Sequence, residues 1–186
     1  MYAYSSRENM KNKKTKQIKR VKRALFIGRF QPFHKGHLDV VKKLLKNYDE
    51  LIIAIGSAEA PISQENPFTA GERIEMIRSC FSKKELLSII IVPIRDVNDH
   101  HKWVSHAISY LPKFESVYSN NELVRKLFYY AGTPAHAIDF FNRHKYEGSK
   151  IRQIMAMGKK EWQDLVPKTV ADFINSCNAH TRLRRV

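Results

Sequence analysis

Residues 28–37 read Gly28-Arg29-Phe30-Gln31-Pro32-Phe33-His34-Lys35-Gly36-His37. They follow the apolar run ALFI at 24–27, which stops at a glycine as a buried parallel strand does. A helix is expected up to about residue 47, because apolar residues recur at helical spacing at Leu38, Val41, Leu44 and Leu45. The stretch is therefore a donor-rich loop that leaves a buried strand and enters a helix.

The rest of the chain repeats this alternation of strand and helix. Further strands are expected at 51–55, 89–92, 117–118 and 135–138, and further helices at 70–81, 103–111, 122–130, 149–157 and 167–176. Thr69 and Glu72 have the spacing of a capping box before the second helix, and Gly158 suits the position just after a helix end. This alternation predicts an α/β fold, a parallel sheet with helices on both faces in a single domain.

The positive charge is concentrated at the ends of the chain. The 186 residues carry a formal net charge of +15, and residues 1–23, with nine basic side chains and one acid, contribute +8 of it. Such a run cannot order itself by burial, so we expect a solvated extension at 1–23, a domain at 24–178 and a basic tail at 179–186. No apolar run approaches the ~20 residues of a membrane span, so no membrane partner is expected.

Cysteine usage favours a cytoplasmic location. Cys80 and Cys177 lie far apart and form no C-x-x-C pair, as expected of a reduced protein in which both are apolar fillers. The basic N-terminal segment also lacks the apolar stretch of a secretory signal.

The loop at 28–37 also carries the most informative chemistry. It contains neither G-x-G-x-x-G nor G-x-x-x-x-G-K-[ST]. His34 and His37 are three residues apart, which places both rings on one face of the first helical turn. Gly36 leaves room for phosphates near the helix N-terminus, whose free N–H groups attract anions, and Arg29 adds a planar cation. The loop therefore predicts a phosphate site, whereas zinc would need more ligands than two histidines.

This stretch closely resembles the signature of the nucleotidyltransferase superfamily with its (H/T)-x-G-H motif. In this form it resembles archaeal-type nicotinamide-nucleotide adenylyltransferases. Phosphopantetheine adenylyltransferases instead tend to carry G-[ST]-F-D-P-x-T-x-G-H, so Arg29, Gln31 and His34 are the discriminating positions. The resemblance runs from about residue 24 to 170 and implies a Rossmann-like, doubly wound sheet.

Further segments are similar to the same family. Residues 146–152 (YEGSKIR) resemble its second signature, often Y-S-G-T-x-x-R, in which Ser149 keeps a hydroxyl in place of threonine and Glu147 departs from serine. The segments after strands two, three and four match at 66–73 (NPFTAGER), 101–106 (HKWVSH) and 119–122 (SNNE).

The resemblance implies attack by the 5′-phosphate of nicotinamide mononucleotide (NMN) on the α-phosphorus of ATP, which gives NAD and pyrophosphate. The catalytic residues that it implies are His34, His37, Arg29 and Arg152. The implied ATP-binding residues are Gly28, Arg29, Phe30, His34, Gly36, His37, Gly148, Ser149 and Arg152, and the implied NMN-binding residues are Trp103, Asn121 and Arg73. Mg²⁺ is expected with ATP, without assigned protein ligands, and the family implies a homo-oligomer, often a hexamer.

Two other functions fit parts of the sequence. Another adenylyl- or cytidylyltransferase of the same fold would share these motifs and differ in its acceptor. A basic nucleic-acid-binding module would explain the net charge, but no aromatic-interleaved basic stripe occurs in the body of the chain. It also leaves Arg29, His34, His37 and Arg152 unexplained, so no nucleic-acid partner is expected.

Overall fold

Five parallel strands form the centre of the fold in the computed structural model, which describes residues 20–97, 99–138 and 146–184. The strands are β1 (Arg23–Gly28), β2 (Glu50–Ile55), β3 (Ile89–Pro93), β4 (Ser116–Tyr118) and β5 (Ala135–His136). Their order in the sheet is β3-β2-β1-β4-β5, and each neighbouring pair is parallel. The predicted α/β class with a parallel sheet is confirmed, with β1 in the middle.

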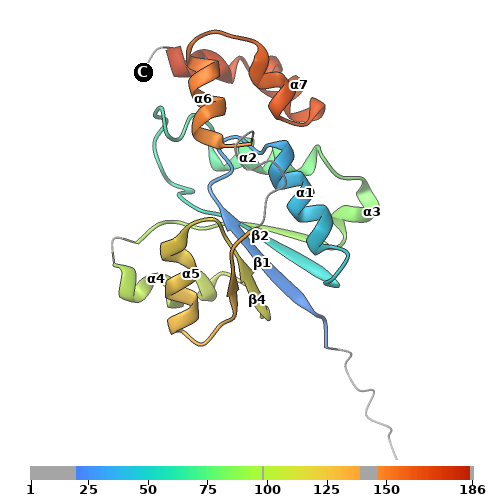
Figure 1. Cartoon of the computed structure of the whole chain (residues 1–186), viewed down its shortest axis with the longest axis vertical. Coiled ribbons are helices and arrows are strands. Elements are labelled where there is room, and N and C mark those ends of the chain that lie inside the picture. The colour runs from blue at the N-terminus through green and yellow to red at the C-terminus, as the bar shows by residue number, and fades with distance from the viewer. Residues whose placement is uncertain (1–19, 98, 139–145, 185–186) are drawn as a thin grey trace, which may run out of the picture.

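Helices cover both faces of the sheet, as Figure 1 shows. One face packs against α1 (Lys35–Leu44), α2 (Ala70–Arg78), the short α3 (Lys83–Leu86), α6 (Gly148–Ala156) and α7 (Lys168–Ser176). The other face packs against α4 (His100–Ser109) and α5 (Glu122–Tyr130). Two 3₁₀ helices, η1 (Glu161–Leu165) and η2 (Ala179–Arg184), pack against α6 and α7 on the first face. No helix among the described residues is long and apolar enough to cross a membrane.

The core has two layers because successive side chains of a strand point to opposite faces. Phe26 of β1 packs in the cluster under α1, α2, α6 and α7, while its neighbour Leu25 packs in the cluster with Trp103 of α4 and Phe128 of α5. Both faces of β1 are thus fully buried, which explains why its sequence is continuously apolar and does not alternate.

Local signals confirm several predicted boundaries. The Thr69 hydroxyl accepts from the backbone N–H of Glu72 at 3.2 Å, and the Glu72 carboxylate accepts from the backbone N–H of Thr69 at 2.8 Å, so the capping box of α2 is complete. Gly158 follows α6 with a φ of 73°, the left-handed conformation expected after a helix end.

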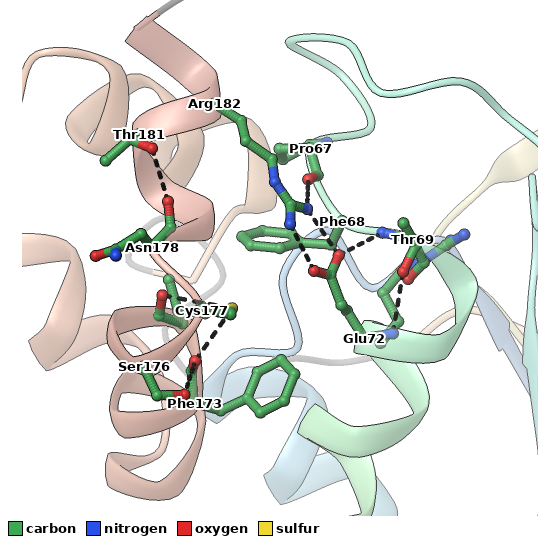
Figure 2. Close-up of polar contacts among 12 residues, drawn as sticks. Pro67, Phe68, Thr69, Glu72, Phe173, Ser176, Cys177, Asn178, Thr181 and Arg182 are labelled. Atoms are coloured by element: carbon green, nitrogen blue, oxygen red, sulfur yellow. Dashed lines mark hydrogen bonds and ion pairs between the residues drawn. The ribbon is translucent and has the colours of Figure 1, made fainter.

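Part of the segment expected as a basic tail at 179–186 packs against the domain. Residues 179–184 form η2, where Ala179 and Leu183 are buried in the core. The Arg182 guanidinium donates to both carboxylate oxygens of Glu72 at 2.8 Å and to the Pro67 carbonyl at 3.1 Å (Figure 2). Counting charges missed this packing, because two apolar side chains and one well-placed ion pair are enough to hold a short segment.

Residues just before the predicted domain start at 24 also contact the domain. Residues 1–19 of the predicted extension lie outside the described residues, but β1 begins at Arg23, whose Nε donates to the Glu50 carboxylate at 2.6 Å. Before it, the backbone N–H of Lys22 donates to Asp49 at 2.9 Å. Of the segment at 1–23, Arg23 therefore belongs to the sheet, and Lys22 contacts the residue before β2.

Candidate active site

A cavity of about 1040 Å³ opens at the carboxyl ends of the central strands. The sheet order places β2 on one side of β1 and β4 on the other, so the cavity lies at the switch in strand order, where open α/β sheets bind their ligands. Most of the residues that the sequence singled out line it: Gly28, Arg29, Phe30, His34, His37, Trp103, Asn121, Gly148, Ser149 and Arg152.

Two histidines cap the N-terminus of α1. His34 is the N-cap and therefore precedes the first helical turn, in which the sequence placed it. Its Nδ1 accepts from the backbone N–H of His37 at 3.2 Å, and Nδ1 of His37 accepts from the backbone N–H of His34 at 3.2 Å. This is a capping box in which two imidazoles replace the usual hydroxyl and carboxylate.

Burial keeps both rings neutral. Desolvation lowers the pKa of His34 to about 3. It also lowers the pKa of His37 well below 6.5, and the adjacent His34 lowers it further. Because each Nδ1 accepts a hydrogen bond, the ring proton of each histidine lies on Nε2. The cavity is therefore lined by two neutral N–H donors whose tautomers are set by the helix cap.

The N-terminus of α6 brings Arg152 to the same loop. Nη1 of Arg152 donates to the Gln31 carbonyl at 2.8 Å, and its Nε donates to the Gln64 carbonyl at 2.9 Å. A Cβ on Gly148 would lie 3.2 Å from the Gln31 oxygen and 3.3 Å from Nη1 of Arg152, tighter than ordinary van der Waals contact. Glycine at this position therefore lets α6 approach the loop closely enough for Arg152 to reach it.

The side chain of Gln31 holds the loop in place. It is buried, its Nε2 donates to the Phe68 carbonyl at 2.8 Å, and its Oε1 accepts from the Phe68 N–H at 3.0 Å. This pair of bonds fastens the loop after β1 to the segment before α2. The sequence marked Gln31 as a discriminating position, and in the structure its side chain links two loops by hydrogen bonds.

Arg29 supplies the uncommitted cation of the cavity. Its side chain is exposed at the cavity wall and makes no hydrogen bond or ion pair with the described residues. Burial lowers the pKa of Arg152 and the positive charge of Arg29 lowers it further, so the two guanidinium groups lie within electrostatic range. Two cations close together without a carboxylate bonded to either favour an anionic ligand.

An aromatic side chain from the second core cluster also reaches the cavity. Trp103 of α4 is buried against Phe128, with ring centroids 5.9 Å apart and planes at 84°. It also lines the cavity, so it serves both the core and the site. Asn121 is the N-cap of α5, and its Oδ1 accepts from the backbone N–H groups of Leu123 at 3.0 Å and Val124 at 3.4 Å.

Two of the expected site residues do not line the cavity. Gly36 is buried inside the first turn of α1. Arg73, expected to bind NMN, is 1% exposed, and its guanidinium donates to backbone carbonyls. The sequence placed Arg73 correctly on a helix but could not show that this side chain turns inward.

Several residues that line the cavity were not assigned to the site from the sequence. Ser57 comes directly after the second strand and its glycine, has a φ of 49°, and donates through Oγ to the Asp96 carboxylate at 2.6 Å. His100 and Tyr146 also line the cavity. Their place after a strand could have identified such residues in the sequence, because every loop at the carboxyl end of a parallel strand lies at the same edge of the sheet.

Within the described residues, no group of three or more His, Cys, Asp or Glu side chains is arranged to hold a metal ion. The donors of the cavity are N–H groups and guanidinium groups, which suit phosphate oxygens and not a metal. The lining also includes the carboxylates of Asp96 and Glu147, and the N–H and guanidinium donors predict an anionic ligand.

The fold is that of a known class. The family model described as cytidylyltransferase-like matches residues 25–154, and the chain belongs to this class of nucleotidyltransferase domains. It is 44% identical over 164 residues to the nicotinamide-nucleotide adenylyltransferase of Thermoplasma acidophilum, covering 88% of this chain and 91% of the relative. The corresponding protein of Archaeoglobus fulgidus is 44% identical over 169 residues, covering 88% and 97%. Within the class, the chain belongs to the nicotinamide-nucleotide adenylyltransferase family.

Solved structures share the fold. A bifunctional NMN adenylyltransferase/ADP ribose pyrophosphatase from Francisella tularensis, complexed with AMP and a manganese ion, matches with a TM-score of 0.70 and 23% identity over 88% of this chain. The chain spans 52% of that protein, about half of its length. The NadR protein in complex with NAD and AMP-PNP matches with a TM-score of 0.57 and 13% identity, over 74% of this chain and 43% of that one.

Proposed function

We propose that this chain transfers AMP from ATP to the 5′-phosphate of NMN, forming NAD and pyrophosphate. The observation that carries the proposal is one cavity lined by neutral His34 and His37, by cationic Arg29 and Arg152, and by the indole of Trp103. The two histidines and two arginines suit the triphosphate of ATP. The flat indole of Trp103 suits the flat, cationic nicotinamide ring. Relatives at 44% identity carry this activity in their names.

The acceptor phosphate is already an anion at pH 7, so the protein needs to position it and neutralise charge. The phosphate oxygen of NMN attacks the α-phosphorus of ATP, and the bond from that phosphorus to the oxygen bridging the β-phosphate breaks. Nε2–H of His37 donates to the α-phosphate as negative charge develops, with His34 beside it. Arg29 and Arg152 hold the β- and γ-phosphates, which leave as pyrophosphate.

Other lining groups position the nucleotides. Gly28 and Phe30 present backbone to ATP after β1, and Gly148 and Ser149 present the N-terminus of α6, where free N–H groups favour phosphate. Trp103 stacks on the nicotinamide ring, and Asn121 lies at the NMN end. Arg73 is not part of this assignment, because its donors face the protein interior.

Mg²⁺ enters in this proposal as part of the substrate, Mg-ATP. The cavity offers phosphate-binding donors and no cluster of metal ligands among the described residues, which fits an ion that bridges phosphate oxygens and keeps much of its water. When bound, it neutralises charge on the triphosphate; replacing Mg²⁺ by Mn²⁺ in the assay tests which ion is preferred.

The decisive experiment offers purified protein Mg-ATP with NMN, nicotinic acid mononucleotide, phosphopantetheine and FMN in turn, and follows pyrophosphate release. We expect NAD formation with NMN, and a loss of about 10²–10³-fold in kcat for His37→Ala. Absence of NAD with all substrates saturating contradicts the proposal, and pyrophosphate release with another acceptor favours the alternative transferase.

We also propose a cytoplasmic homo-oligomer, in keeping with the two free cysteines, Cys80 and Cys177, and with the family. Sedimentation of the purified chain tests the assembly. The same preparation, titrated with duplex DNA at rising salt, tests the expectation that nucleic acid is no partner, since a nucleic-acid module would bind tightly with a steep salt dependence.

A further inference from the structure

Arg73 is a buried arginine whose side chain donates hydrogen bonds to backbone carbonyls. Four of its five N–H groups are engaged: Nε with Thr69 at 3.2 Å, Nη1 with Arg29 at 2.9 Å and Gly56 at 2.8 Å, and Nη2 with Ser57 at 3.0 Å. No carboxylate among the described residues forms an ion pair with it. A charge buried in this way is costly, so a merely space-filling role is a poor explanation.

Three of the four carbonyls that Arg73 binds belong to the ends of two neighbouring strands, and the fourth, that of Thr69, belongs to the N-cap of α2. Arg29 directly follows β1, and Gly56 and Ser57 directly follow β2. The guanidinium therefore holds the loop after β1 and the loop after β2 together, at the edge of the sheet where the cavity opens.

Two of the peptide units held in this way precede residues with unusual backbone angles. Phe30 has a φ of 53° and Ser57 a φ of 49°. The left-handed region is unfavourable for a residue with a side chain, and it persists only where the surroundings enforce it. The bonds from Arg73 to the Arg29 and Gly56 carbonyls enforce the peptide orientation at both places.

The orientation of these peptides decides where their N–H groups point. In a trans peptide the C=O and N–H bonds point in opposite directions. When the Arg29 and Gly56 carbonyls face Arg73, the N–H groups of Phe30 and Ser57 face away from it. Both residues line the cavity, and neither N–H has a hydrogen-bond partner within the described residues.

We propose that Arg73 is a positioning residue which turns the backbone N–H groups of Phe30 and Ser57 into the cavity, where they bind phosphate oxygens of the nucleotide. This rests on the proposed function for the identity of the nucleotide, but not for the binding of a phosphate. Arg73 itself does not touch the substrate. Its contribution is a pair of preorganised donors from two different strands.

The test compares the full chain with Arg73→Met, Arg73→Lys and a matched control, Arg182→Met, which removes an arginine that also binds a carbonyl near α2 but lies outside the cavity. Inorganic pyrophosphate is titrated into ¹⁵N-labelled protein, and the amide signals of Phe30 and Ser57 are followed. We expect both signals to shift in the wild type. We expect pyrophosphate affinity to fall about tenfold or more in Arg73→Met and to be only partly restored in Arg73→Lys, which keeps the charge but not the planar fork.

Kinetics separate positioning from stability. We expect kcat to fall about 10²-fold in Arg73→Met, with KM for NMN within about twofold of the wild type, because misplaced donors act on the reacting phosphate. Arg182→Met should lower the melting temperature and keep kcat at 25 °C. Arg73→Lys serves if Arg73→Met does not fold.

Unshifted Phe30 and Ser57 signals in the wild type would overturn the proposal. So would wild-type pyrophosphate affinity in both Arg73 variants, full recovery in Arg73→Lys, or an equal kcat loss in Arg182→Met. A wild type that binds pyrophosphate through these amides but makes no NAD would refute the proposed function and leave this inference standing.

Discussion

The imidazole rings of His34 and His37 lie face to face, with centroids 3.4 Å apart and planes inclined by 16°. Two protonated rings could not share this space, since their charges would repel in a buried site. The stacking and the reciprocal bonds to the backbone therefore define one state, in which both rings are neutral and carry their proton on Nε2.

This state is directly observable. We expect long-range ¹H–¹⁵N spectra of the free protein at pH 7 to show unprotonated Nδ1 and protonated Nε2 for both His34 and His37, because each Nδ1 accepts a backbone N–H. The exposed His101 gives an internal comparison in the same spectrum. A protonated Nδ1 on either ring of the pair would contradict the geometry.

The same pair makes folding sensitive to acid. The folded-state pKa of His34 is about 3 and that of His37 is well below 6.5, while an unfolded histidine titrates near 6.5. Below pH 6.5 the unfolded chain thus binds more protons, and the free energy of unfolding falls, by about 1.4 kcal/mol per pH unit for each histidine that stays neutral. Above pH 6.5 the two contribute no slope.

Urea unfolding at pH 7.5, 6.0 and 5.0 measures this slope, in a range that lies above the ordinary pKa of carboxyl groups. The double variant His34→Asn/His37→Asn is the control and should show a flatter pH dependence. Equal slopes for the two proteins would contradict the prediction.

Arg29 should matter for substrate and not for folding. Its side chain makes no hydrogen bond or ion pair with the described residues, so Arg29→Gln should leave the melting temperature within about 1 °C and raise KM for ATP about tenfold, the effect of losing one charged contact to phosphate. Arg95→Gln, an exposed arginine that does not line the cavity, is the matched control. A large loss of stability in Arg29→Gln would show that the side chain has a structural partner.

Glu147 departs from the serine of the related signature and lies where phosphate is expected. It is the N-cap of α6, lines the cavity and accepts from the Ser149 hydroxyl at 2.8 Å. Glu147→Ser should remove a negative charge and free that hydroxyl, so we expect KM for ATP to fall about two- to fivefold, in line with charge effects at helix ends. Glu161→Ser, an exposed change outside the cavity, controls for net charge. A higher KM for ATP in Glu147→Ser would assign the carboxylate a positive role in binding.

The ion pair between Arg182 and Glu72 should stabilise the domain. Its bidentate geometry and partial burial predict that Arg182→Met lowers the free energy of unfolding by about 1–3 kcal/mol. A double-mutant cycle with Glu72→Gln in urea unfolding isolates the coupling of the pair. Strictly additive single effects would show that the contact contributes nothing of its own.

The sheet was predictable because buried parallel strands leave continuous apolar runs, as 24–27 and 51–55 do. Helices with clear caps, such as the one after Thr69, were predictable for the same kind of local reason. The segment at 179–184 was not, since it is held by a side chain more than a hundred positions away in the sequence, and local charge outweighed two apolar residues.

Which loops contribute residues to the candidate site was predictable from their places at strand ends. Which side chains face the cavity and which face the protein interior was not. His37 and Arg152 were placed in the cavity from spacing and resemblance. Arg73 was expected at the NMN site, yet it faces inward, because the direction of a helical side chain depends on packing that no local pattern records. Ser57 was missed, since an isolated serine after a glycine carries no chemical signal in the sequence.

The central place of β1 in the sheet has a consequence for local unfolding of the protein. Its amides are bonded to β2 on one side and β4 on the other, so they should open to hydrogen exchange only in global unfolding, while the outer strands β3 and β5 fray first. The loop at 28–37 grows directly out of β1. Local opening at the margins of the sheet should therefore leave this loop, with the proposed phosphate-binding residues, in place.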